Sequence, residues 1–301
     1  MEWLIYAIAA PAMYAVVNFI DKYIVGSETV DYRGMPIVSA LVGVLTGTLL
    51  WIMTGCPLLS FKDGLLVVIT GILAVFAAVL YFKAVYNEAA SKIIILMQMV
   101  PLFVLGLSVL FLHEILSGRQ VVGFLMIFLT AGIMTLITGK PTAGVRMSNR
   151  VFLLIICADL MWAVSSVLLK YLVAENDVWK IFIYQTWGAG LGGLVLFFSF
   201  PQMRMAFIWS LRTVNVFVTG LILLNEIVFV TGKLFNILAL STGPAALVSV
   251  LGGTQVFFGL IYGLVLTKTM PLVYHEDISR KGLVKQLILA FSMFIGICLL
   301  Y

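Results

Sequence analysis

The stretch VFLLIICADLMWAVSSVLLKYLV, residues 151–173, decides the fold class. Its 23 residues carry only two charged side chains, Asp159 and Lys170. A run of roughly 20 mainly apolar residues can cross roughly 30 Å of hydrocarbon as a helix. Backbone groups in lipid must bond within their own segment, which favours a helix over a strand. We therefore expect residues 151–173 to span a membrane.

Nine further apolar runs, separated by charged residues, Gly and Pro, are also expected to span the membrane. The ten expected spans are residues 3–25, 35–54, 64–85, 91–112, 120–138, 151–173, 181–200, 214–237, 244–267 and 283–301. The whole chain of 301 residues is 63% hydrophobic and 10% charged, with a mean hydropathy of +1.17. Soluble domains carry about 25% charged residues. These numbers predict an all-α integral membrane protein without room for a separate enzyme domain.

The two halves of the chain are related. Residues 13–25, MYAVVNFIDKYIV, align with residues 161–173, MWAVSSVLLKYLV, with six identities in thirteen positions. One clear linker, residues 139–150, lies near the midpoint. We predict two five-helix repeats, 1–138 and 151–301, on either side of it. Because five is odd, the second repeat would enter the membrane with opposite polarity, which places a binding site between the halves near the midplane.

Short motifs in the first half carry a family resemblance. The residues Phe111-Leu-His-Glu114 are followed by Gln120 and Gly123, and Pro101 precedes them. This pattern resembles the ten-helix EamA-domain family of the drug/metabolite transporter superfamily, in the apolar-Glu end of helix four and the Gln-x-x-Gly start of helix five. The resemblance implies a secondary transporter of small organic solutes, without a cofactor, in a prokaryotic cell membrane.

The second half departs from that pattern. At a shift of 154 residues, Pro101 falls on Gln255 and Glu114 falls on Lys268. An insertion of about ten residues, which includes His275-Glu276-Asp277, precedes the last helix. These differences leave the subfamily and the substrate open.

Polar side chains form one stripe on each of two repeat-related helices. Because helical neighbours recur every three or four residues, each set lies on one face. The two stripes are Asp159, Trp162, Ser166 and Lys170, and Pro11, Tyr14, Asn18 and Lys22. Each offers a ring, a hydrogen-bonding group and an ammonium, so we predict that they line a substrate pathway. The alternative for Lys22 and Lys170 is that they extend to lipid headgroups.

Acids inside the membrane are costly and are typical of proton relays. Asp159 lies about eight residues into its helix, and Glu226 shares a helix face with Lys233. We predict that Asp159 and Glu226 carry the coupling proton. The alternative is a static ion pair with Lys233 or Lys83.

Further polar residues are weaker candidates. Lys83, near Glu88 and Lys92, is expected either to gate one mouth of the pathway or to lie in a solvated loop. The glutamines within apolar spans either contact the substrate or join helices. They are Gln98, Gln185 and Gln255.

Small residues are expected to let helices approach closely. The spacings Gly43-x-x-x-Gly47 and Gly188-x-x-x-Gly192 are typical of helix packing. Gly243-Pro244 suits a helix start, and Gly252-Gly253 suggests a hinge.

Several other classes of protein are not indicated. The net charge of +5 is scattered rather than clustered on a basic face, which argues against nucleic-acid binding. No Walker A spacing occurs, and the two histidines and three cysteines lack metal-ligand spacing. We therefore expect neither a metal nor a cofactor. The first apolar run begins at Glu2-Trp3 without a basic leader, so it is taken as a span rather than a signal peptide.

Two criteria disagree about orientation. Most Lys and Arg of the loops follow the fifth, seventh and ninth spans, and loops rich in these residues mark the cytoplasmic side. That rule places both termini outside the cell, whereas the resembled family has both inside.

We predict a secondary transporter, with export as the expected direction, for amino acids or other amphiphilic metabolites. Alternating access between two inverted repeats is the expected mechanism, with protons as the candidate coupling ion. The expected partners are the small-molecule substrate and membrane lipids, and the protein is expected to be a monomer or a homodimer. The alternatives are a flippase for a lipid-linked intermediate and a membrane-embedded transferase built on His113, Glu114 and Arg119.

Overall fold

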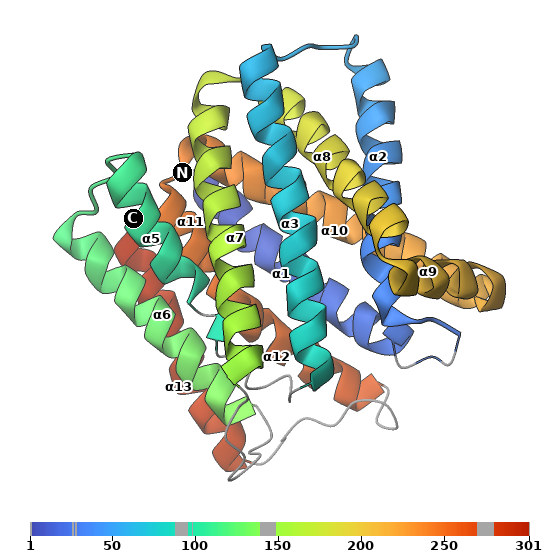
Figure 1. Ribbon diagram of the computed structural model, residues 1–301. Coiled ribbons are helices and arrows are strands. Elements are labelled where there is room, and N and C mark those ends of the chain that lie inside the picture. The colour runs from blue at the N-terminus through green and yellow to red at the C-terminus, as the bar shows by residue number, and fades with distance from the viewer. Residues whose placement is uncertain are drawn as a thin grey trace.

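Helices account for nearly all of the structure in the computed structural model, which describes residues 2–25, 27, 29–87, 96–97, 99–138, 149–269 and 280–300 (Figure 1). The longer helices are α1 (Glu2–Val25), α2 (Met35–Met53), α3 (Phe61–Asn87), α5 (Val100–Phe111), α6 (Gly118–Thr138), α7 (Asn149–Glu175), α8 (Val178–Ser199), α9 (Pro201–Thr213), α10 (Val216–Thr242), α12 (Gln255–Thr269) and α13 (Arg280–Leu300). The short elements are η1 (Tyr32–Gly34), α11 (Ala245–Leu251) and η2 (Gly252–Thr254).

Seven helical stretches within the described residues are long and apolar enough to cross a membrane. Three shorter apolar helices accompany them, at Val100–Phe111, Gly118–Ile133 and Leu287–Leu300. The predicted membrane class is therefore confirmed, while the count of ten spans stays a prediction. The predicted linker lies outside the described residues except for its last two positions, where α7 begins.

The helices pack in a pattern that brings distant segments together. In Figure 1, α2, α3, α7 and α8 run side by side, while α1 and α10 cross behind them. The α6 and α13 helices pack against each other beside α5. The two chain ends lie near each other at the same end of the bundle.

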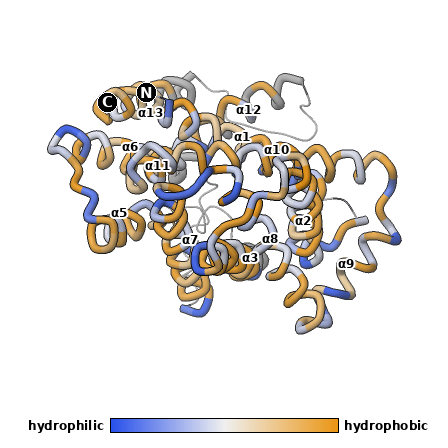
Figure 2. Tube along the Cα trace, turned by 90° about the horizontal axis from the view of Figure 1, so that it is seen from above, coloured by the Kyte–Doolittle hydropathy of each residue, from blue (hydrophilic) through white to orange (hydrophobic). Residues whose placement is uncertain are grey.

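Apolar residues cover the outside of the bundle as well as its interior. In Figure 2, hydrophobic residues follow the helices all around the edge of the bundle, and hydrophilic residues lie mainly at helix ends and in loops. Large apolar side chains such as Leu45, Leu110 and Phe291 are more than 60% exposed. In a bilayer these side chains face lipid, so their exposure carries no penalty.

Glycines bring α8 into backbone contact with α3 and into close contact with side chains of α2. A Cβ at Gly188 would lie 2.7 Å from the Cα of Val68, and a Cβ at Gly71 would lie 2.8 Å from the carbonyl carbon of Gly188. On the opposite face of α8, a Cβ at Gly190 or Gly193 would overlap a side chain of α2. The predicted packing role of the small-residue spacings is confirmed within one chain.

The predicted span 244–267 is broken rather than continuous. Pro244 occupies the N-cap of α11, which confirms the predicted helix start. The chain then tightens into η2 at Gly252 and resumes as α12 at Gln255. A tight 3₁₀ turn inside a helix is often a hinge, so the structure places an irregularity at the predicted glycine pair.

The α9 helix was not predicted. It begins at Pro201 directly after α8 and packs against η1, where Gly34 leaves no room for a side chain beside Phe207. The backbone N–H of Asp31 donates to Ser210 Oγ at 2.9 Å, and Thr213 Oγ1 donates to the carbonyl of Thr29 at 2.8 Å. These bonds fix α9 across the end of α2.

The turn between α2 and α3 contains left-handed backbone. Gly55 and Cys56 have φ values of 82° and 57°. A residue other than glycine is uncommon in this region. The side chain of Cys56 is exposed at this turn.

Candidate substrate pathway

Glu226 lies on the buried face of α10 and is bound to α2. The Ser39 hydroxyl donates to Glu226 Oε1 at 2.5 Å, and only 2% of Glu226 is exposed. Within the described residues, the second oxygen of Glu226 has no hydrogen-bond partner. Lys233, two turns further along α10, lies instead over the ring of Phe182, with 5.9 Å from Nζ to the ring centroid. The predicted static pair of Glu226 with Lys233 is therefore not formed.

A second acid lies beside Glu226. Asn225 Nδ2 donates to Asp21 Oδ1 at 2.7 Å, which joins α10 to α1. Asp21 is close enough for its charge to act on Glu226 and on Tyr81 of α3. Helices α3 and α10 thus place polar groups near Asp21 of α1, although the sequence analysis gave Asp21 no role.

An aromatic contact extends this polar region to α7. The rings of Tyr81 and Trp162 lie 6.0 Å apart, in a tilted arrangement. Trp162 belongs to the predicted stripe of α7, and Tyr81 connects that stripe with Asp21. The structure therefore brings part of the predicted α7 surface to the same region as Glu226.

Asp159 is completely buried one turn from Trp162 along α7. Neither of its carboxylate oxygens has a hydrogen-bond partner among the described residues. An unpartnered buried carboxylate is costly unless it is neutral or meets a counter-charge. Asp159 therefore stays the second candidate for proton coupling.

The α1 stripe lies partly in a helix contact. The ring of Tyr14 packs 5.8 Å from that of Phe229, and a Cβ at Gly232 would lie 2.9 Å from Tyr14 Cε1. Asn18 is exposed. Lys22 belongs to α1, but its side chain lies outside the described residues, so its predicted contact with substrate stays a prediction.

Lys170 and Glu114 bind backbone groups. Lys170 Nζ donates to the carbonyl of Leu240 at 2.9 Å, which joins α7 to the end of α10. Glu114 Oε1 accepts from the backbone N–H of Ala245 at 2.9 Å and so caps α11. Arg119 donates to the carbonyl of Cys298 at 3.3 Å. These contacts give structural roles to Glu114 and Arg119, two of the three residues of the suggested transferase site.

The remaining predicted residues are dispersed. Lys83 is exposed near the end of α3, and Ser166 and Gln255 are half-buried on α7 and α12. Gln98 lies outside the described residues, as do Glu88, Lys92 and the inserted 275–277 segment. The structure thus unites Glu226 and Trp162 in one region and leaves the substrate roles of the other residues as predictions.

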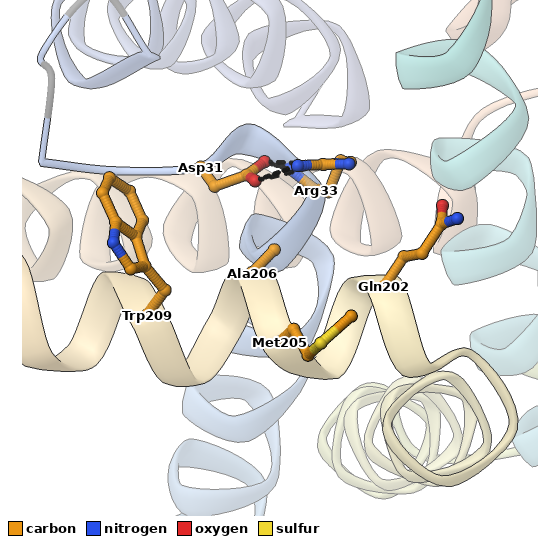
Figure 3. Close-up of a pocket in the computed structure, with 6 residues that line it drawn as sticks. All are labelled: Asp31, Arg33, Gln202, Met205, Ala206 and Trp209. Atoms are coloured by element: carbon orange, nitrogen blue, oxygen red, sulfur yellow. Dashed lines mark hydrogen bonds and ion pairs between the residues drawn. The ribbon is translucent and has the colours of Figure 1, made fainter.

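An open cavity of about 320 Å³ lies apart from these residues, between α9 and the start of α2. Figure 3 shows the Asp31–Arg33 ion pair facing Gln202, Met205 and Trp209 of α9. None of the predicted site residues lines it.

The polar region offers carboxylates, hydroxyls and aromatic rings. Among the described residues, no group of three or more His, Cys, Asp or Glu could hold a metal ion. The groups present can bind a polar solute and hold or release a proton.

Comparison with known proteins agrees with the resemblance seen in the sequence. Residues 1–136 match the model of the EamA-like transporter family. A comparison with curated proteins finds no match. A solved structure described only as "Crystal structure of protein" superposes with a TM-score of 0.72 at 16% identity, over 99% of this chain and 98% of that chain. At this identity the likeness shows the fold alone.

Proposed function

Because residues 1–136 belong to the EamA-like transporter family, we propose that the chain is a secondary active transporter of small organic metabolites that works by alternating access. The family implies membrane transport of small molecules by a multi-pass membrane protein, and its members are transporters rather than enzymes. The proposal adds export as the direction and amino acids or other amphiphilic compounds as the substrate class.

The convergence of polar side chains inside the bundle carries this proposal. Five helices contribute Asp21, Ser39, Tyr81, Trp162 and Glu226 to one region. Polar and ionisable groups within a membrane are expensive and usually mark substrate or ion pathways. A purely structural bundle would not need two acids at one helix contact.

The packing of the helices supports two inverted repeats. If α1 corresponds to α7 and α3 to α10, the contact of α1 with α10 becomes the contact of α7 with α3, and both are extensive. The contact of α1 with α12 likewise exchanges with that of α7 with α5. Such exchange is expected of repeats 1–138 and 151–301 related by an axis in the membrane plane.

The chain's own acids are the proposed means of coupling. Glu226 lies at the contact of α10 with α2 and Asp159 on α7, so a proton on either could be exchanged as helices separate. No nucleotide-binding motif occurs in the sequence, which favours an ion gradient as the energy source.

The test is proton release from purified protein during addition of a panel of amino acids and amphiphilic metabolites. Wild type should release protons on binding its ligand. Asp159→Asn or Glu226→Gln should reduce the amount of proton released at least tenfold. Glu175→Gln is the matched control because Glu175 is an exposed acid at the end of α7. Flux into proteoliposomes with an imposed pH gradient completes the test.

The outcomes separate the alternatives. Substrate flux that depends on the pH gradient and on either acid supports the proposal. Flux that ignores both acids overturns proton coupling. Binding of a lipid-linked compound, without binding of any soluble metabolite, would reject metabolite transport and favour a flippase.

A further inference from the structure

Lys233 is a charged side chain inside the bundle that the proposed function does not use. It belongs to α10 and lies nine residues before that helix ends at Thr242. At 1.5 Å per residue, about 14 Å of helix separate Lys233 from this end. Side chains on a helix lean toward its N-terminus, so the stem of Lys233 points away from the nearer end. Extension of the ammonium to lipid headgroups, the usual explanation for a lysine on a membrane helix, therefore does not account for its position.

The Lys233 ammonium faces an aromatic ring but no acceptor. Its Nζ lies 5.9 Å from the ring centroid of Phe182 of α8, and only 1% of Phe182 is exposed. Among the described residues, none accepts a hydrogen bond from Lys233 or forms an ion pair with it. Lys170, by contrast, donates to the carbonyl of Leu240. An ammonium carries three N–H donors, and a ring attracts the charge but leaves these donors unpaired.

The acids of the bundle do not supply the missing negative charge. Glu226 precedes Lys233 by two turns, about 10 Å along the axis of α10, and is bound to Ser39 of α2. Asp159 of α7 has no hydrogen-bond partner among the described residues, and so does not bind Lys233 either. The α10 helix packs extensively on α1 but only sparsely on α2 and α8. Lys233 therefore lies at a loosely packed contact of α10, where a solute displaces few protein contacts.

The surroundings of Lys233 favour an organic anion over an inorganic one. Phe182 belongs to the main apolar core, and Leu234 packs against that core. One turn before Lys233, the ring of Phe229 packs on that of Tyr14, with 5.8 Å between the centroids. Carboxylate and phosphate oxygens accept hydrogen bonds from an ammonium and compensate its charge. Apolar neighbours suit the carbon skeleton of such a molecule, whereas a small inorganic ion would lose its hydration there.

We propose that Lys233 binds the anionic group of the transported solute, a carboxylate or a phosphate ester. Organic anions are then the substrate class, and Lys233 is the residue that determines this specificity. A neutral solute could accept a hydrogen bond from Lys233 but would leave the charge uncompensated. The identification of the anion as the transported solute rests on the proposed function, whereas the binding of the anion does not require transport.

The experiment measures binding to purified full-length protein through its thermal unfolding. A ligand that binds only the folded state raises the unfolding midpoint with its concentration. The probes are matched pairs of an anion and its counterpart without the negative charge: leucine and leucine amide, phenylpropionate and phenylpropionamide, and phenethyl phosphate and phenethyl alcohol. Chloride and inorganic phosphate are the inorganic comparison. We expect a saturable rise with at least one organic anion and none with its counterpart.

Lys233→Met tests the ammonium because it removes the charge and keeps an apolar stem. It should weaken binding of the anion by about tenfold or more. Because the ammonium has no acceptor in the ligand-free protein, the same variant should raise the ligand-free unfolding midpoint. Lys62→Met, which removes an exposed lysine at the start of α3, is the matched control and should keep wild-type affinity. If Lys233→Met does not fold, Lys233→Gln is expected to weaken anion binding as well.

A lack of response to every organic anion in wild type overturns the proposal, as does equal anion affinity in wild type and Lys233→Met. A lower ligand-free midpoint of Lys233→Met with unchanged anion binding also overturns it, because Lys233 would then be a structural partner of Phe182. A response to chloride or inorganic phosphate as strong as that to the organic anions rejects the organic class. Flux of neutral solutes without anion binding would reject the role of Lys233 and leave the proposed transporter intact. Anion binding through Lys233 without flux into proteoliposomes would do the reverse.

Discussion

Two contacts of α2 with its neighbours differ in their chemistry. Toward α8, α2 packs through glycines such as Gly47 and Gly190, and α8 continues into an equally close contact with α3 at Gly71 and Gly188. Toward α10, the hydrogen bond of Ser39 with Glu226 joins the two helices. We call the glycine contacts of α8 with α2 and α3 the glycine seam, and the contact of α2 with α10 the polar seam.

The difference separates a fixed contact from one that can change. In the glycine seam, backbone packs on backbone between α8 and α3, and glycines pack on side chains between α8 and α2. A displacement there loses close-packed contacts that nothing replaces. The polar seam consists of groups that can bond to water, a proton or a ligand after the helices part. In the proposed repeats, α3 with α8 corresponds to α10 with α2, yet only the first of these pairs is closely packed. This asymmetry is expected of one state of the proposed alternating-access cycle, in which the polar seam would be the side that opens.

Breaking the glycine seam should have the largest effect. In Gly188→Ala the new Cβ would overlap the backbone of Val68, and α3 must move away. We expect a loss of about 1–3 kcal/mol in stability, measured as a lower unfolding midpoint. Gly220→Ala on α10, where a Cβ would meet nothing within 4 Å, is the control and should be neutral or stabilising. Equal midpoints for the two variants would contradict the close packing.

The polar seam is tested by Ser39→Ala. The variant removes the described hydrogen bond between α2 and Glu226, and a typical hydrogen bond contributes about 0.5–1.5 kcal/mol net. We expect lower stability together with altered transport kinetics. Ser241→Ala, which loses only a bond within α10, should change neither. Unaltered transport by Ser39→Ala would show that the polar seam does not open.

A hydrogen bond in the glycine seam provides a direct comparison. Trp187 Nε1 of α8 donates to Thr48 Oγ1 of α2 at 3.1 Å. Thr48→Val removes this acceptor, and a bond between neutral groups contributes about 1 kcal/mol. We expect a small decrease in the unfolding midpoint with wild-type substrate flux. A loss of flux would mean that the two seams are not mechanically distinct.

The smallest effect is expected at the ion pair outside the membrane. Hydrogen bonding from the Arg33 guanidinium lowers the pKa of Asp31 below its usual range. The ionised form is therefore favoured in the folded state, and its stabilisation is present above about pH 4 and is lost as the pH falls through the lowered pKa. Arg33 is 49% exposed, so the contribution is below about 1 kcal/mol. At pH 7 the Asp31→Asn variant should have a slightly lower unfolding midpoint than wild type. In acid the two midpoints should be equal. A difference that grows in acid would contradict this assignment.

The sequence predicted the helices better than the polar contacts. Apolar length alone identified the membrane class, and Gly243-Pro244 identified the start of α11. The α9 helix was missed because its composition is too polar for a span, and its position depends on bonds to residues about 180 positions away.

Contacts between distant residues also explain what was missed in the site. Glu226 was recognised as an isolated acid within an apolar run, but its partner Ser39 has no distinctive sequence context. Asp21 was overlooked because attention went to its neighbour Lys22, which aligns with Lys170 in the second half of the chain. Its position near the predicted helix end was a signal equal to that of Lys22. Packing of α1 on α10 is what gives Asp21 its importance.

The left-handed turn between α2 and α3 gives the protein a natural topological reporter. All three cysteines are exposed, but Cys157 and Cys298 lie on the apolar helices α7 and α13, whereas Cys56 lies in this turn. The connections on that side carry the smaller share of Lys and Arg, so the charge rule places the Cys56 thiol outside the cytoplasm. With that orientation a membrane-impermeant maleimide should label Cys56 on intact cells, and Cys56→Ser should remove the label. The orientation of the resembled family, with both termini inside, predicts no labelling of Cys56. The unmodified chain would then reveal which compartment each mouth of the pathway faces, and hence whether a measured flux is uptake or efflux.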